Sequence, residues 1–456
     1  MNERSNAKTY EQASAAGIDL VDLEARAKRL VHAAQKAGAS AADAYVGLGQ
    51  SQSVAIRHGD VEVAERSESD GFTLRVFVGD KHASVSSNMP SEEEMLAERA
   101  VAMAKVSPND PFATLGDRER LATELPDLDL FDGTRLSSEE LADLAKRSEA
   151  TALAVTGITN TNSAGASQGT GGMVLATSDG FVGSSVSSSF GVSISAVAGE
   201  GTAMQRDYDY SSKRHYADLA NPEDIGRNAA ERTLARLNPR KVETGTYTVI
   251  LDPRCANSMI GHLAGAINGA AIARQTSFLK DSLGEQVLAR GVTIRDDPHI
   301  LRGPASRPCD GEGVQNGALT LVDDGVLTEW LLDTGTAKEL GLVTNGRSGR
   351  GSPSTPNIYI KNGSRSPQDL LAEVERGIYV TDFIGSGVNG VTGDYSRGVS
   401  GFLIEKGEIR EAVSEITIAG NLKDMFLQIE PANDLEFRYS ANSPTLSLGQ
   451  LTVAGN

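Results

Sequence analysis

The chain has 456 residues, 39% of them hydrophobic, and its 43 basic and 61 acidic side chains give a formal net charge of -18. This length favours two domains, and so acidic a surface repels nucleic-acid backbones, so we expect no direct contact with DNA or RNA. Short apolar runs, a polar start and only two cysteines, Cys255 and Cys309, argue against a membrane span, an export signal and a disulfide framework, and favour the cytoplasm.

Helix boundaries in the first half of the chain are marked by characteristic residues. An amphipathic helix is predicted to stop at Gly38, and its apolar stripe is formed by Leu20, Leu23, Ala27, Leu30 and Val31. Two capping boxes, Ser91 with Glu94 and Ser137 with Glu140, predict the starts of two further helices.

Between these helices the sequence predicts β-hairpins. One hairpin turns near His58-Gly59-Asp60 and the next near Gly79-Asp80. The longest alternation of apolar residues runs from Phe190 to Ala196, turns at residues 199–201 and returns through Tyr208 and Tyr210. Mixed helices and hairpins indicate the α+β class with mostly antiparallel sheets.

A domain boundary is predicted in the polar stretch "LNPRKVETG", residues 237–245, where a helix ends and the strand "TYTVIL" begins. We therefore expect an N-terminal α+β domain over residues 1–240 and a β-rich C-terminal domain over residues 241–456. Short strands and glycine-rich turns dominate the second part. Helix starts with a first-turn proline are predicted at Asn221-Pro222, Asp252-Pro253 and Ser366-Pro367.

Two short motifs match known functional fingerprints in sequence, but their flanking residues do not predict the secondary structure that each fingerprint needs. "GSGVNG", residues 385–390, has the spacing of a dinucleotide loop, but the following "VTGDYSRGVSG" is a poor helix, and such a loop needs a helix to hold phosphate. "GASQG", residues 165–169, has the spacing of a serine-hydrolase elbow but lacks the strand before and the helix after it, so Ser167 is expected in a loop.

The segment "DDPHILRGPASRPCDGEG" contains side chains that could ligate a metal ion. Its possible donors are His299, Cys309, Asp310 and Glu312. None of the paired spacings typical of metal sites occurs there, so we expect an ordered loop instead.

The helix expected after Asp252-Pro253 carries three glycines at four-residue spacing, Gly261, Gly265 and Gly269, with His262 among them. Each glycine costs a helix roughly 1 kcal/mol relative to alanine, so three on one stripe need a reason. Either another backbone packs closely there or the stripe leaves an open groove.

The segments "QTSFLKDSLGEQV", "CDGEGV", "GVNGVTGDYSRGVSGFLIEKGEI" and "LTVAG" resemble the TldD/PmbA family, and specifically its PmbA (TldE) branch. They span most of residues 250–456, whereas the first half agrees only in its order of helices and hairpins. In the TldD branch the same helix resembles a metallopeptidase helix with an HExxxH motif, and a cysteine near the C-terminus completes a zinc site.

Alignment on the shared "TSFL" places the HExxxH positions at Ile260, Gly261 and Gly265, with His262 out of register. These residues offer neither a metal ligand nor a general base, and the C-terminal stretch contains no cysteine. The resemblance therefore implies no catalytic residue, no metal and no cofactor in this chain, with zinc supplied by a TldD-like partner in a heterodimer.

The family resemblance implies a subunit that closes a peptidase chamber and holds an extended peptide or unfolded protein, with links to microcin maturation, antitoxin degradation and DNA gyrase modulation. If the chain modulates gyrase, we expect it to do so by acting on proteins or peptides, with no direct contact with DNA. The candidates for the peptide groove are Gly261, Gly265, Gly269, Arg274, Asp394, Tyr395 and Arg397.

Two alternatives remain open from the sequence. The chain could be an active metallopeptidase, as a homodimer or through a different metal site around His262, His299 and Cys309. It could also be a non-enzymatic adaptor that binds folded proteins, as a gyrase modulator would.

Overall fold

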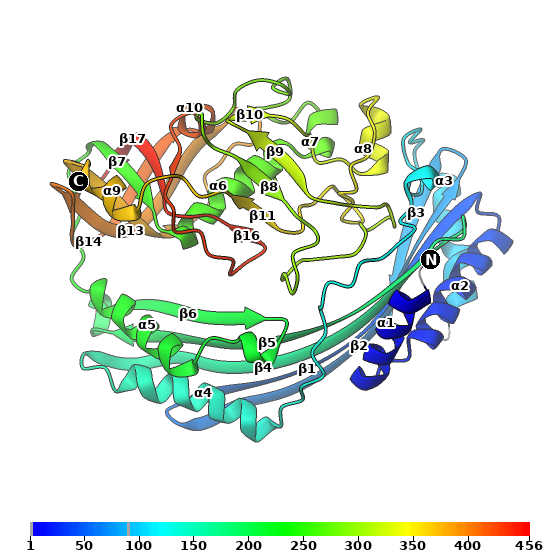
Figure 1. Ribbon diagram of the computed structural model, residues 1–456, viewed down its shortest axis with the longest axis horizontal. Coiled ribbons are helices and arrows are strands. Elements are labelled where there is room, and N and C mark those ends of the chain that lie inside the picture. Colours follow the sequence, from blue (N-terminus) through cyan, green and yellow to red (C-terminus); the bar gives the residue numbers. More distant parts are fainter. Residues whose placement is uncertain (1–2, 89–91) are drawn as a thin grey trace.

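The N-terminal half of the chain is built on one long antiparallel sheet that curves around the C-terminal half (Figure 1). The structure, a computed structural model, describes residues 3–88 and 92–456. The strand order is β3-β2-β1-β4-β5-β6, so β3 and β6 are the edge strands. The strands are β1 (Ala41–Arg57), β2 (Asp60–Val78), β3 (Lys81–Ser87), β4 (Ile158–Thr177), β5 (Val182–Ala198) and β6 (Gln205–Lys213).

Helices cover only the convex face of this sheet (Figure 1). They form two groups at the two ends of the long strands, and each group buries its own apolar cluster against the sheet. One group is α1 (Glu3–Ala16), α2 (Leu20–Lys36) and α3 (Glu93–Val106); the other is α4 (Ser138–Leu153) and α5 (Pro222–Ala235).

The two faces of the sheet differ sharply in composition because strand residues alternate between them. Residues on the convex face are largely apolar, such as Val46, Ile56 and Val192, and are buried under the helices. The middle of the concave face, which is turned toward the C-terminal half, carries glycine and serine: Gly47, Gly49, Ser51 and Ser53 on β1, Gly165, Ser167, Gly169 and Gly171 on β4, and Ser185, Ser187, Ser189, Gly191, Ser193 and Ser195 on β5.

The expectation that Ser167 lies in a loop is wrong. Ser167 sits in the middle of β4, paired with Ser53 on one side and Gly191 on the other. Glycine and serine are poor strand formers, but this strand is central and buries Ala164, Ala166 and other alternate residues under α4. Packing on one face therefore overrides local propensity, and no nucleophile elbow is formed because β4 continues through the motif.

Most of the predicted helix ends and turns are confirmed. Ser137 and Glu140 form a capping box at α4, and Gly38 follows the end of α2 with a φ of +103°. The first hairpin turns at His58 and Gly59, both with positive φ. Ser91 lies outside the described residues; α3 begins at Glu93, and its N-cap residue makes no side-chain capping bond.

The C-terminal half contains two sheets. Five strands are ordered β10-β9-β8-β11-β16, and six are ordered β14-β13-β12-β7-β17-β15, where an additional pairing of β14 with β17 closes the sheet on itself. The first sheet comprises β8 (Ile294–Asp296), β9 (Leu319–Asp323), β10 (Val326–Leu327), β11 (Ile358–Ile360) and β16 (Ala441–Asn442). The second comprises β7 (Gly245–Leu251), β12 (Arg376–Ile384), β13 (Asp394–Glu405), β14 (Glu408–Asn421), β15 (Glu430–Pro431) and β17 (Leu446–Ala454).

Five helices belong to this half: α6 (Pro253–Ala266), α7 (Gly269–Ala273), α8 (Thr334–Glu339), α9 (Pro367–Ala372) and α10 (Leu422–Phe426). The glycine-rich helix is shorter than its sequence suggests, because Asn268 accepts a hydrogen bond from the Ala270 N–H and starts α7. Gly261 and Gly265 therefore lie in α6, whereas Gly269 is the first residue of the next helix.

The structure confirms the α+β class and the predominance of antiparallel pairing; among the named strands of the described chain only β7 with β12 and β11 with β16 pair in parallel. The motif "GSGVNG", residues 385–390, is followed by strand β13, so no helix starts there, as its sequence suggested. None of the helices in the described ranges combines the length and apolar character that crossing a membrane requires.

Candidate functional site

Helix α6 is positioned by a proline-capped start and an apolar face. Asp252 accepts a hydrogen bond from the Arg254 N–H, and Pro253 occupies the first turn. The buried face, with Met259, Ile260 and Leu263 at most 1% exposed, packs into the largest apolar core of the molecule. The opposite stripe of α6 is therefore held in a fixed orientation away from this core.

The three glycines meet different surroundings. A Cβ added at Gly261 or Gly265 would find no atom within 4 Å, whereas one at Gly269 would lie 2.7 Å from the Leu331 carbonyl oxygen. Gly269 is thus needed because the backbone around it is closely packed, whereas Gly261 and Gly265 face open space. Ile260, aligned with the first histidine of the HExxxH pattern, points into the core and is 0% exposed.

The structure brings His262, Tyr395 and Arg397 together beside α6. The rings of His262 and Tyr395 lie edge to face with centroids 5.9 Å apart. Burial and the nearby Arg397 cation lower the pKa of His262, and burial raises the pKa of Tyr395, so both side chains are neutral near pH 7.

The other predicted groove residues lie in different surroundings. Arg397 donates to the Gly385 carbonyl oxygen and stacks over the Phe383 ring at 4.1 Å. Asp394, the first residue of β13, is exposed and accepts hydrogen bonds from Thr392 just before the strand and from Asn421 at the end of β14. Arg274 is exposed just after α7.

The four possible metal ligands named from the sequence do not form a metal-binding cluster in the described residues. His299 Nε2 pairs with Asn316 Oδ1 at 2.8 Å, and burial raises the pKa of the Cys309 thiol to about 12. Asp310 accepts bonds from three backbone N–H groups, and Glu312 accepts one from the Thr334 N–H at the start of α8 and lies 3.6 Å from Arg75, so both carboxylates already have partners. Across residues 3–88 and 92–456, no three His, Cys, Asp or Glu side chains lie close enough to share a metal ion.

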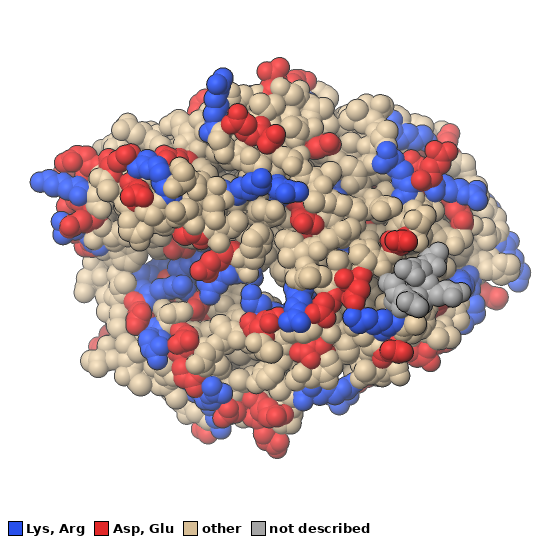
Figure 2. Space-filling view, in the orientation of Figure 1, with Lys and Arg blue, Asp and Glu red and all other residues tan. Residues whose placement is uncertain are grey.

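A cleft runs between the two halves as three cavities that share wall residues. The first, about 170 Å³, lies at the start of α6 and shares Arg438 and Tyr439 with the second, of about 420 Å³. The second shares Arg214 with the third, of about 280 Å³. Figure 2 shows the molecule hollowed between its two halves, with basic and acidic side chains gathered around the hollow.

Strand β6, whose Ser212 and Lys213 line the second cavity, is an edge strand, since it pairs only with β5 in its sheet. Its residue Tyr208 is 48% exposed, stacks with Tyr210 at 6.2 Å, and Tyr210 in turn contacts Tyr439 at 5.6 Å. Across from it, Arg254 of α6 lies over the Tyr208 ring and donates to Asp207 at 2.9 Å. Aromatic rings and an arginine thus join the edge strand to α6.

Sequence reasoning missed this part of the cleft. Tyr208 and Tyr210 were recognised as strand residues, but Arg254, Arg438 and Tyr439 lie far away in the chain and carry no local motif. The available signal was the two tyrosines on one face of a polar edge strand. The two tyrosines alone did not indicate a cleft, because the residues opposite them are brought there only by the tertiary fold.

Comparisons with known proteins agree along nearly the whole chain. Family models match residues 42–104 (PmbA/TldA metallopeptidase domain 1), residues 131–237 (central domain) and residues 244–455 (C-terminal domain). Metalloprotease PmbA of Escherichia coli O157:H7 is 39% identical over 407 residues, which cover 88% of this chain and 90% of that protein.

Solved structures share the fold. A candidate modulator of DNA gyrase from Bacteroides thetaiotaomicron superposes with a TM-score of 0.87 at 28% identity, covering 94% of this chain and 98% of that one. TldE from Thermococcus kodakarensis superposes with a TM-score of 0.81 at 20% identity, covering 94% of this chain and 100% of that one.

Proposed function

Since the chain belongs to the TldD/PmbA metallopeptidase family, we propose that it is a PmbA-like subunit that holds an extended peptide while a TldD-type partner supplies the zinc. The observation that carries the proposal is the lack of large side chains on two surfaces of the molecule. Gly261 and Gly265 leave open space on α6, and glycine and serine line the concave face of the sheet.

A surface of small side chains suits a substrate whose own side chains vary. An extended peptide satisfies its backbone by pairing with the edge of a sheet, and β6 is an edge strand whose Ser212 and Lys213 line the second cavity. Tyr208 and Tyr210 supply aromatic contact area there without demanding a particular sequence. The peptide would then lie between β6 and the exposed stripe of α6.

The absence of catalysis in this chain is supported by its residues at the positions of the HExxxH pattern. Ile260 is buried in the core, and neither Gly261 nor Gly265 has a donor atom. A zinc site of the family type does not fit these residues, so no step of hydrolysis is assigned to them. We further propose the cytoplasm as the place of action, consistent with two unpaired cysteines.

The proposal is tested by purifying the chain alone and in complex with a TldD-type subunit, then measuring zinc content and cleavage of an unfolded polypeptide. We expect zinc and cleavage only in the complex. Gly261→Trp and Gly265→Trp should reduce cleavage at least tenfold with the zinc content unchanged, whereas Gly261→Ala should behave like the wild type.

Two results would replace the proposal. Stoichiometric zinc in the isolated chain, lost on His262→Ala or Cys309→Ala, would make it a metallopeptidase in its own right. A stable complex that never cleaves peptide, whatever partner subunit is added, would favour the adaptor that binds folded proteins, including a gyrase modulator. Thermal melting of each tryptophan variant excludes misfolding as the cause of lost activity.

A further inference from the structure

The third cavity of the cleft has the most apolar lining of the three. It lies between the concave face of the N-terminal sheet and the loop around residues 306–311, with a volume of about 280 Å³. Its apolar lining comes from Leu125, Leu130, Met173, Leu175 and the ring of Tyr45. This volume is close to the lower end of small-molecule sites, roughly 300 Å³.

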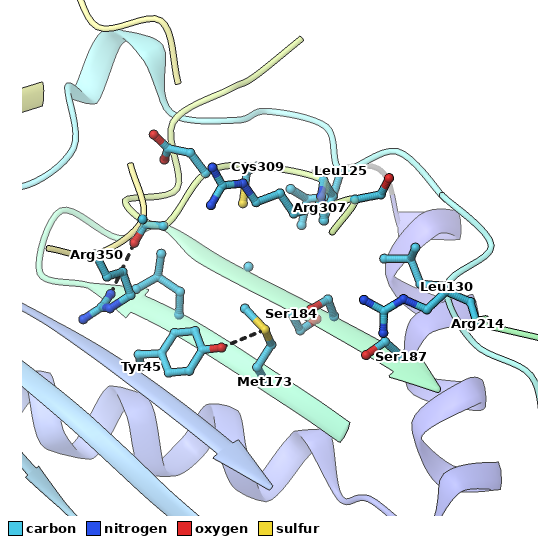
Figure 3. A pocket seen from close by; sticks show the side chains of 18 residues that line it. Tyr45, Leu125, Leu130, Met173, Ser184, Ser187, Arg214, Arg307, Cys309 and Arg350 are labelled. Atoms are coloured by element: carbon cyan, nitrogen blue, oxygen red, sulfur yellow. Dashed lines mark hydrogen bonds between the residues drawn. The ribbon is translucent and has the colours of Figure 1, made fainter. Parts of the chain in front are cut away.

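Three arginines line the same cavity. In Figure 3, Arg350 and Arg214 lie on opposite sides of the view, and Arg307 and Cys309 lie above Tyr45 and Met173. Arg350 is paired with Asp43 at 2.7 Å. The other two arginines therefore decide the net charge of the cavity.

Arg214 and Arg307 carry poorly compensated charge, although Asp310 and Asp296 attract Arg307 from beyond ion-pair distance. In the described part of the chain neither forms an ion pair, and the buried Nε–H group of each has no hydrogen-bond partner. Burial lowers the pKa of both guanidinium groups. Their terminal nitrogens donate only to neutral oxygens, those of Ser188 and Pro304 for the first and of Ser348 and Ser354 for the second.

The lining contains one acidic side chain, Asp310, which attracts Arg307 without reaching ion-pair distance. Its Oδ1 accepts from the Glu312 and Val314 N–H groups and its Oδ2 from the Ser348 N–H. A buried cation without a partner is costly, and an anion that enters beside it recovers charge-assisted hydrogen bonds.

We propose that this cavity binds a carboxylate carried on an apolar chain, with Arg214 and Arg307 holding the carboxylate and the leucine and methionine side chains holding the apolar part. The carboxylate belongs either to a free acid or to the C-terminal end of a peptide. The site goes beyond the proposed role in holding a peptide backbone, because it is defined by one charged group and exists in this chain without a partner subunit.

The test is calorimetric titration of the isolated full chain with four probes: hexanoate, hexanamide, N-acetyl-leucyl-leucine and the amide of that dipeptide. We expect at least one acid to bind at least tenfold more tightly than its matched amide. Hexanoate binding assigns a free acid, and binding of the dipeptide acid alone assigns a peptide end. Equal binding of acids and amides, or no binding of either acid at millimolar concentration, overturns the proposal.

Variants locate the site. Arg307→Gln and Arg214→Gln should each weaken binding at least tenfold, whereas Arg302→Gln, which removes an exposed and ion-paired arginine of the neighbouring cavity, should not. Ser185→Phe fills the cavity without touching a charge and should also abolish binding. If an arginine variant melts early, the serine variant still decides the outcome.

Inorganic phosphate is the remaining probe. Phosphate that binds as tightly as the better acid would mean that the apolar lining contributes nothing, which contradicts the proposed ligand class. Because every titration uses the isolated chain, failure here leaves peptide cleavage by the two-subunit complex intact, and loss of that cleavage leaves acid binding intact. The two proposals therefore fail separately.

Discussion

Arg350 Nη2 lies 2.7 Å from Asp43 Oδ1, although the two residues are 307 positions apart in the chain. Asp43 also accepts a hydrogen bond from Arg75 at 2.6 Å, and Arg75 lies 3.6 Å from Glu312. Two acids and two arginines thus form one largely buried network that fastens the N-terminal sheet to the C-terminal half. The relative position of the two halves, and with it the width of the cleft, depends on this network.

Removal of the central acid should destabilise the protein strongly. Asp43→Asn leaves two arginines without their shared carboxylate, and breaking a buried pair in this way costs about 3–5 kcal/mol. Urea denaturation measures the loss. The matched control is Glu68→Gln in the exposed pair with Arg66, where we expect less than about 0.5 kcal/mol; equal effects at both sites would contradict the fastening role.

Glu312 should make stability depend on pH. Burial raises the pKa of this carboxyl from 4.5 to about 7. The folded state then retains a proton that the unfolded chain releases, so stability is greatest below pH 4.5 and falls as the pH rises toward 7. In Glu312→Gln this loss should disappear, and the variant should gain up to about 3 kcal/mol relative to the wild type between pH 5 and 8. A difference between the two proteins that does not change with pH would refute the assignment.

The three glycines of the α6 and α7 region should respond differently to alanine. Gly261→Ala and Gly265→Ala add a methyl group to open space in a helix and should each stabilise the protein by about 0.5–1 kcal/mol. Gly269→Ala should destabilise it, because its Cβ would collide with the Leu331 carbonyl oxygen. Thermal melting of the three variants gives the order, and destabilisation at all three positions would mean that α6 has no open face.

The aromatic edge of the cleft should contribute to peptide binding. Tyr208→Ala should weaken the binding of a labelled unfolded peptide about three- to tenfold, the range of one aromatic contact. Fluorescence anisotropy of the complex with a TldD-type subunit measures the affinity. Met103→Ala, on the exposed side of α3, is the control; an unchanged affinity in the tyrosine variant would place the peptide elsewhere.

Sequence patterns predicted those elements whose signals are local. The capping box at Ser137, the stop at Gly38 and the hairpin at His58 depend on residues within a few positions of one another. Strand β4 was missed because its residues have little strand propensity, and it forms only between β1 and β5. The break at Asn268 was missed because an asparagine inside an apparently helical stretch capped a new helix.

The candidate site was predictable only in part for the same reason. The bareness of Gly261 and Gly265 is visible in the sequence, but whether a glycine faces space or a neighbouring backbone is decided by distant residues such as Leu331. The cavity with Arg214 and Arg307 joins segments nearly a hundred positions apart by the tertiary fold. No local sequence pattern predicts that these two arginines line the same cavity.

The long strands of the N-terminal sheet have a consequence for folding. The apolar clusters under α2 and under α4 lie at opposite ends of β1, β4 and β5, so both clusters are complete only when these strands have paired along their full length. β1 must also wait for β4, which the ribosome delivers only after β2, β3 and two helices. The nascent chain therefore exposes an unmatched strand for much of its synthesis, and its yield in the cell should depend on chaperones that shield such strands.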